Sequence, residues 1–145
     1  MKDIKNVVII VVIAIVVIFV LLGALRKSNE FGDIKSYVSD NKSELESVKD
    51  DYLAGNETTL PKEIEKVEII KTENDTLVYF KMYDRTDKKS NIGFYYSEKD
   101  FPSALEKKEI DIIELGGDKY KWDEENTAGI TNKISDNWYF YKKTK

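Results

Sequence analysis

The strongest strand signal in the chain lies at residues 77–83, which read LVYFKMY. Aromatic and β-branched residues favour strands, and side chains at alternate positions of a strand point to the same side. Val78 and Phe80 therefore share one side of the predicted strand, and Tyr79 and Tyr83 share the other. The segment therefore predicts a strand with apolar side chains on one side and tyrosines on the other.

Six further segments have the composition of strands and are separated by short polar turns. They are residues 66–71, 92–97, 110–115, 119–123, 129–134 and 138–142. Short connections such as Gly116-Gly117-Asp118 and Ser135-Asp136-Asn137 join antiparallel neighbours, so the sheet is predicted to be antiparallel. Between these strands, residues 97–105 (SEKDFPSAL) predict one turn of helix capped by Asp100.

An amphipathic helix is predicted ahead of the strands, at residues 33–53. Its apolar residues recur at steps of three, four and seven, which places them on one face, and charged residues fill the other face. Asp33 is the expected N-cap, and Gly55 is the expected stop. A one-sided helix must lie on another element, so we expect an α+β domain in which this helix packs on an antiparallel sheet of five to seven strands.

The N-terminal part of the chain contains a long apolar run at residues 7–25, VVIIVVIAIVVIFVLLGAL, with no charge, amide or proline. A helix of this length spans roughly 28 Å, close to the thickness of a hydrocarbon core. The run is too long for a signal-peptide core, and its small-residue cleavage pattern is poor, so an uncleaved anchor is predicted. We expect residues 1–6 to be a cytoplasmic N-terminus, 7–25 a transmembrane helix, 26–32 a linker and 33–145 an extracytoplasmic α+β domain.

The orientation across the plasma membrane rests on weaker signals. Lys2 and Lys5 precede the run, whereas Arg26 and Lys27 follow it, so counting basic residues does not decide. Long domains translocate largely regardless of their charge, and a chain without cysteine suits an oxidising exterior. These two arguments favour a single-pass protein with its N-terminus inside and its domain outside.

Composition excludes several classes of function. The chain has 23 Lys and Arg against 27 Asp and Glu, a net charge of −4, and it contains no His or Cys. The charges are interspersed, whereas a nucleic-acid-binding protein has a clustered basic face, so no nucleic-acid partner is expected. The missing imidazole and thiol groups exclude the usual zinc sites, disulfides and imidazole triads, and no metal or cofactor is expected.

Tyrosines form the candidate interaction face. Alternation in the predicted strands places a set of them on the side of the sheet away from the helix. The set is Tyr79, Tyr83, Tyr95, Tyr139 and Tyr141. A large ring that ends in a hydroxyl suits recognition of a protein, peptide or glycan, but tyrosine also favours strands for structural reasons.

Carboxylates and Ser–Lys pairs are the remaining candidates for chemistry. The closest acidic groups are Asp84 with Asp87, Asp111 with Glu114, and residues 123–125; none has the spacing of a calcium loop. Glycoside hydrolysis would need a paired-acid cleft, for which the sequence gives no sign. Serines 39, 43 and 47 near Lys42 and Lys49 have the spacing of an ordinary exposed helix face. We therefore expect a protein that is not an enzyme, and a hydrolase of envelope polymers is the least favoured alternative.

The overall plan resembles that of short, uncharacterised single-pass membrane-anchored proteins of low-GC Gram-positive bacteria. The residues that carry this resemblance are the N-terminal anchor, YLAG at residues 52–55, GFYYSEKDFP at 93–102 and KISDNWYFY at 133–141. The resemblance implies an envelope location and adds no activity and no site residue.

Two hypotheses of function follow from the sequence. In the first, the chain is a membrane-anchored, non-catalytic binding module of the cell envelope, whose partners are the lipid bilayer and another membrane or envelope protein. In the second, it is a regulatory subunit that acts through its transmembrane helix. Small residues at four-residue spacing often mark helix–helix contacts in membranes, and Ala14, Gly23 and Ala24 do not repeat in that way.

Overall fold

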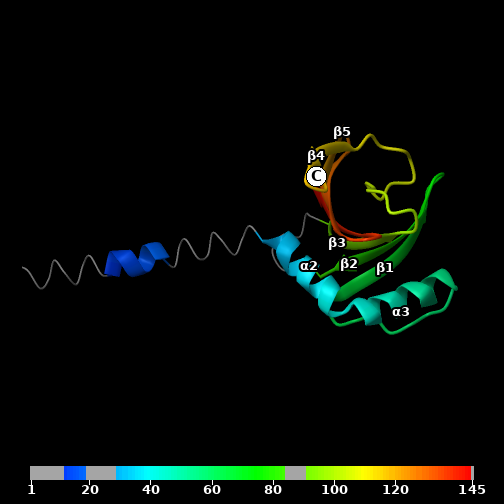
Figure 1. Cartoon of the computed structure of the whole chain (residues 1–145), viewed down its shortest axis with the longest axis horizontal. Coiled ribbons are helices and arrows are strands. Elements are labelled where there is room, and N and C mark those ends of the chain that lie inside the picture. Colours follow the sequence, from blue (N-terminus) through cyan, green and yellow to red (C-terminus); the bar gives the residue numbers. More distant parts are fainter. Residues whose placement is uncertain (1–11, 19–28, 84–90, 145) are drawn as a thin grey trace, which may run out of the picture. The chain divides into compact units, whose positions relative to one another are not determined.

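The computed structural model describes residues 12–18, 29–83 and 91–144 (Figure 1). The chain divides into two compact units, Met1–Asp33 and Ile34–Lys145. In the first unit, residues 12–18 are helical, and the rest of the apolar run at 7–25 lies outside the described residues. No helix within the described ranges has the length and apolar character needed to cross a membrane.

Two helices replace the single helix predicted at residues 33–53. They are α2, Glu30–Asp40, and α3, Lys42–Leu53. The break falls at Asn41, whose side-chain amide donates to the Tyr37 carbonyl oxygen at 2.8 Å. Asparagine bonds readily to nearby backbone groups, which offers the chain an alternative to continuous helix. The prediction of one uninterrupted helix was therefore wrong, and Asp33 lies in the first turn of α2 rather than at its cap.

The predicted stop at Gly55 is confirmed. This residue has φ of 79°, a left-handed conformation that glycine adopts without steric cost. The Gly55 N–H donates to the Tyr52 carbonyl at 3.0 Å, and the Asn56 N–H donates to the Asp51 carbonyl at 2.9 Å. These two bonds form a Schellman motif and satisfy carbonyl groups at the end of α3.

All seven predicted strands are present, in one antiparallel sheet. They are β1, Ile64–Lys71; β2, Thr76–Met82; β3, Asn91–Ser97; β4, Ile113–Gly116; β5, Lys119–Glu124; β6, Thr127–Ser135; and β7, Trp138–Thr144. The strand order is β1-β2-β3-β7-β6-β5-β4, so β1 and β4 are the edges. The α+β class and the antiparallel sheet are therefore as expected.

The two helices lie against one face of β2, β3 and β7 (Figure 1). Phe80 and Phe94 stack in the sheet at a centroid distance of 4.9 Å, and Tyr37 of α2 lies 6.1 Å from Phe94. The Trp138 indole donates to Glu46 of α3 at 3.1 Å. Leu45 is fully buried in the same region. This face is the first hydrophobic core of the domain.

A segment without helix or strand covers part of the opposite face. Residues 98–112, which we call the strap, connect β3 to β4 and loop across the concave side of the curved sheet (yellow in Figure 1). The helical turn predicted at residues 97–105 does not form. Asp100 and Leu105 instead have φ of 58° and 55°, and such left-handed residues end any helical path. The strap is thus an irregular chain that is packed onto the sheet.

Candidate functional site

The tyrosines predicted as an interaction face lie together but are buried. Tyr79, Tyr95 and Tyr139 are directly paired across β2, β3 and β7, as the alternation predicted. They and Tyr141 are at most 6 % exposed, because Ala104 and Leu105 of the strap pack on them. The interpretation of these four residues as an exposed docking face was therefore wrong; they form a second hydrophobic core.

Tyr83 is the exception among the predicted residues. It follows the end of β2 and is 55 % exposed, so it does not join the buried cluster. The structure brings four of the five candidate residues together and leaves the fifth at the surface.

Two buried tyrosines hold the strap through their hydroxyl groups. The Tyr95 hydroxyl accepts a hydrogen bond from the Ser103 N–H at 2.7 Å and lies 2.9 Å from the Thr131 hydroxyl. The Tyr139 hydroxyl donates to the Asp100 carbonyl oxygen at 2.9 Å. Burial raises the pKa of both hydroxyls, so both stay protonated at neutral pH. These tyrosines therefore position the strap.

The Asp100 carboxylate fixes the start of the strap to the β6–β7 turn. It accepts hydrogen bonds from the Lys133 ammonium at 2.6 Å and the Asn137 N–H at 2.8 Å. The Tyr139 hydroxyl lies 3.0 Å away and shares its one proton between this carboxylate and the Asp100 carbonyl oxygen. Partial burial acts to raise the pKa of Asp100, but these hydrogen bonds outweigh it and hold that pKa below its ordinary value. The residue predicted as a helix cap is a latch between distant segments.

The Asp75 carboxylate makes a second latch, between the β1–β2 turn and the strap. It accepts hydrogen bonds from the Ser97 hydroxyl at 2.6 Å and the Lys99 N–H at 3.1 Å. The Ser97 hydroxyl in turn accepts from the Phe101 N–H at 2.8 Å. The turn and the strap are thereby held at a fixed separation.

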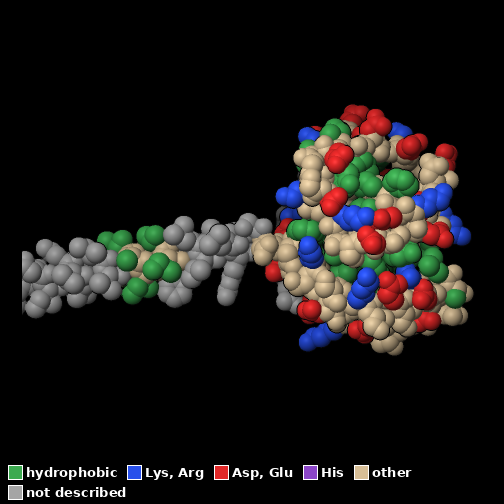
Figure 2. Space-filling view, in the orientation of Figure 1, with side chains coloured by type: hydrophobic (Ala, Val, Ile, Leu, Met, Phe, Trp, Pro, Cys, Tyr) green, Lys and Arg blue, Asp and Glu red, His purple; other side chains and the backbone are tan. Residues whose placement is uncertain are grey.

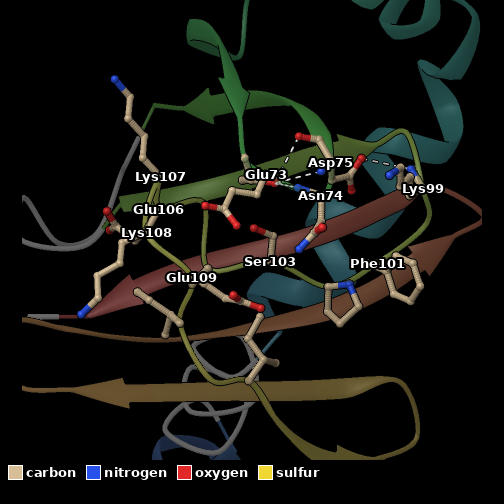
Figure 3. Close-up of a pocket in the computed structure, with 15 residues that line it drawn as sticks. Glu73, Asn74, Asp75, Lys99, Phe101, Ser103, Glu106, Lys107, Lys108 and Glu109 are labelled. Atoms are coloured by element: carbon tan, nitrogen blue, oxygen red, sulfur yellow. Dashed lines mark hydrogen bonds between the residues drawn. The ribbon is translucent and has the colours of Figure 1, made fainter.

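A pocket of about 830 Å³ lies between these two fixed segments (Figure 3). The β1–β2 turn contributes Glu73 and Asn74, and the strap contributes Phe101, Ser103 and Glu109, among other residues. In Figure 3, Glu73, Asn74 and Ser103 lie near the middle of the pocket, whereas the side chains of Lys107 and Lys108 extend away from it. The pocket therefore presents a few side-chain oxygen atoms within a lining that is mostly apolar.

The lining of the pocket carries both signs of charge, because Lys99, Lys107 and Lys108 belong to it together with acidic residues. Glu73 and Glu109 are exposed carboxylates of its lining, and Phe101 is 64 % exposed. Glu106 is committed elsewhere, because it accepts from the Lys143 ammonium at 2.6 Å. Exposed carboxylates and an exposed aromatic ring are groups that can bind amines and guanidinium groups.

The other candidates from the sequence do not assemble into a site. Within residues 12–18, 29–83 and 91–144, no three acidic side chains come together in a way that could hold a metal ion. Lys49, one lysine of the weighed Ser–Lys pairs, is engaged with Glu46 and Asp50 and lies 4.4 Å from the Tyr96 ring centroid. Asp84 and Asp87 lie outside the described residues. The pocket itself was missed, because no local pattern indicates that residues 72–75 and 99–112 meet.

Comparison with known proteins adds no further assignment. No family model matches this sequence, and no curated protein and no solved structure is significantly similar to it.

Proposed function

We propose that this chain is a single-pass, membrane-anchored and non-catalytic binding module of a bacterial cell envelope, with its α+β domain on the outer side of the plasma membrane. The apolar run at residues 7–25 supports the anchor, and the resemblance to short envelope proteins supports the location. A tether of this kind confines the domain to a thin layer, which raises its effective concentration towards other membrane-bound partners.

The pocket between the β1–β2 turn and the strap is the binding site in this proposal, and it is the single observation that carries the binding function. Its two walls are held by the Asp75 and Asp100 latches, so the site is formed before the partner arrives. Binding to a preformed site avoids the entropic cost of ordering it.

The partner group at this pocket is the side chain of a lysine or arginine on a membrane or envelope protein. Glu73 and Glu109 supply negative charge, and the exposed Phe101 ring supplies a face for the cation. The net charge of −4 attracts a basic partner over longer distances at low salt. On the face of the domain that Figure 2 shows, acidic and basic side chains are interspersed, so the pocket rather than a charged patch on that face provides the selectivity.

The non-catalytic part of the proposal rests on the sequence. With no His and no Cys, the chain lacks the commonest general base and the commonest thiol nucleophile. The one carboxylate whose pKa is clearly displaced, within the described part of the chain, is Asp100, and its displacement is accounted for by the latch.

Photo-crosslinking in intact cells tests the binding site. A photoreactive phenylalanine analogue at Phe101 is expected to give a discrete adduct with one envelope protein. The same analogue at Tyr83, which is also exposed, is the matched control and is expected to give none. The double change Glu73→Gln and Glu109→Gln should reduce the Phe101 adduct at least several-fold. Equal adducts at both positions, or an adduct that is insensitive to the two glutamates, would reject the pocket.

Protease treatment of intact cells tests the location. Added protease is expected to degrade residues 26–145 while leaving a cytoplasmic control protein whole. Protection of the domain until the cells are lysed would place it inside and would contradict the proposed orientation.

A further inference from the structure

One surface of the domain carries exposed aliphatic residues without a covering element. These residues are Ile113 and Leu115 of β4 and Ile130 of β6, which are 52 %, 54 % and 40 % exposed. They belong to β4 and β6, which follow in strand order beyond β2, β3 and β7, where the two helices pack. Exposed apolar residues that cluster in this way mark contact surfaces more often than residues that are scattered singly.

Strand register shows that basic residues alternate with these aliphatic ones. Ile113 pairs with Lys121, Lys121 pairs with Ile130, and Ile130 pairs with Lys142. Directly paired residues project to the same side of a sheet, so these four make one row across β4, β5, β6 and β7. The row lies on the outer face, because the next residue along β5, Trp122, is buried in the tyrosine cluster on the other face.

The charges of this outer face have the sign opposite to that of the whole chain. A shallow groove of about 370 Å³ includes three members of the row, Lys121, Ile130 and Lys142, and Asp123 is its one acidic lining residue. Lys119, which is exposed, adds a further positive charge beside it. The net charge of the chain is −4, so a basic and aliphatic face is a local exception.

We infer that the outer face of β4–β6 docks on the anionic surface of a lipid bilayer, with its aliphatic side chains at the headgroup level and Lys119 and Lys121 on the lipid phosphates. This inference rests on the proposed function, because the anchor keeps the domain beside the membrane. Lysines near an anionic membrane surface and aliphatic side chains at its interface both favour binding, and tethering makes a weak contact sufficient. The occupant is a lipid surface rather than a second copy of the chain, because two copies of this face would bring like charges together.

The same face leaves the pocket free. The docking residues belong to β4–β7, whereas the pocket is lined by the β1–β2 turn and the strap. A docked domain would therefore keep Phe101 available to a partner.

The experiment uses the full chain in lipid vesicles and a fluorescent reporter on the outer face. Because the chain has no cysteine, Ile130→Cys gives a single labelling position for an environment-sensitive nitrobenzoxadiazole dye. Ile69→Cys on β1 is the matched control, since Ile69 is 38 % exposed and Ile130 is 40 % exposed. Vesicles contain either phosphatidylcholine alone or phosphatidylcholine mixed with phosphatidylglycerol.

The expected result is a blue shift and a gain in dye emission at position 130 with the mixed vesicles and none with phosphatidylcholine alone. Position 69 should respond to neither. The double change Lys119→Glu and Lys121→Glu should abolish the response at position 130, and high salt should weaken it. Both lysines are exposed, and circular dichroism would verify that the domain stays folded.

Three results would overturn the inference. The first is the absence of a lipid-dependent response at position 130, and the second is an equal response at positions 130 and 69. The third is a response to soluble polyphosphate in the presence of neutral vesicles, which would reassign the face to a soluble anionic polymer. Flotation of the chain with vesicles of phosphatidylcholine alone tests the anchor separately. A chain that fails to float contradicts the proposed function, while the dye at position 130 still reports whether the face binds phosphatidylglycerol.

Discussion

Two buried tyrosine hydroxyls differ in whether they have a hydrogen-bond partner, and this difference predicts opposite effects on stability. Tyr95 bonds to Ser103 and Thr131, whereas the Tyr79 hydroxyl is buried without a partner within the described part of the chain. A buried hydroxyl without a partner keeps the cost of leaving water, and the phenylalanine variant removes that cost. Tyr95→Phe should lower the free energy of unfolding by about 1–3 kcal/mol, whereas Tyr79→Phe should leave it unchanged or raise it by about 1 kcal/mol.

Urea unfolding of the full chain in detergent micelles measures both variants. Trp122 and Trp138 are buried on opposite faces of the sheet, so tryptophan fluorescence reports on both cores. A loss of stability in Tyr79→Phe as large as in Tyr95→Phe would contradict the difference between the two hydroxyls.

The Asp100 latch predicts a stability contribution that disappears in acid. Asn at position 100 keeps the shape of the side chain and tolerates the φ of 58°, but it removes the negative charge that Lys133 faces. Asp100→Asn should lower the free energy of unfolding by about 1–3 kcal/mol at neutral pH, as expected for hydrogen bonds to a charged group.

The sign of the pH dependence follows from the depressed pKa of Asp100. In the unfolded chain this carboxyl has its ordinary pKa of 3.8, and in the fold its pKa is lower. The latch therefore contributes fully above that ordinary value and loses its contribution as pH falls through the folded value. Urea titrations should show the wild type and Asp100→Asn converging in acid; a constant difference down to that pH would exclude the carboxylate as the source.

At the scale of elements, the sequence predicts strands well because alternation and turn residues are local signals. All seven strands lie where their composition placed them, and Gly55 ends α3 as expected. Two local features were misread, the break at Asn41 and the helical turn at residues 97–105, because a side-chain bond in one case and left-handed residues in the other override the helical pattern.

Alternation also placed the tyrosines correctly on one face but could not show what covers that face. Whether a face is exposed depends on contacts between segments that are distant in the sequence, here Ala104 and Leu105 of the strap. The same limit applies to the pocket, since its two walls are joined by latches between residues far apart, such as Asp75 with Ser97. Local pattern thus predicts the elements of this domain, and tertiary contacts determine its candidate site.

The strap is expected to open before the sheet unfolds. It contains no helix and no strand. Side-chain hydrogen bonds and the burial of two aliphatic residues therefore hold it, instead of the backbone hydrogen bonds of a strand. Segments with few backbone hydrogen bonds open at lower free energy than central strands. Thiol labelling of Ala104→Cys, 4 % exposed, should be at least about tenfold faster than that of Val78→Cys, which is fully buried in β2.

The dependence of labelling on urea separates local from global opening. Local opening exposes little surface, so the rate at position 104 should change little at low urea, whereas the rate at position 78 should follow global unfolding. Equal rates with equal urea dependence would show that strap and sheet open as one unit.

At the scale of the whole molecule, anchoring, lipid contact and partner binding are assigned to different parts of the chain. We propose that the apolar run holds the domain at the bilayer, that the outer face of β4–β6 rests on the lipid, and that the pocket between the β1–β2 turn and the strap binds the partner. The pocket offers the exposed carboxylates of Glu73 and Glu109, whereas the outer face offers the exposed ammonium groups of Lys119 and Lys121. An anionic lipid surface and a basic partner group can therefore be bound at the same time without competing.

Replacing residues 7–25 with a polyleucine segment of equal length discriminates between a binding module and a regulator that acts through its transmembrane helix. Polyleucine keeps the hydrophobic length that spanning requires but removes every sequence-specific helix contact. If the domain performs the binding, the photo-adduct at Phe101 should persist at the wild-type level, within about twofold, because tethering depends on hydrophobic length alone. Loss of the adduct from a variant that still fractionates with membranes would assign partner choice to the helix and favour the regulatory alternative.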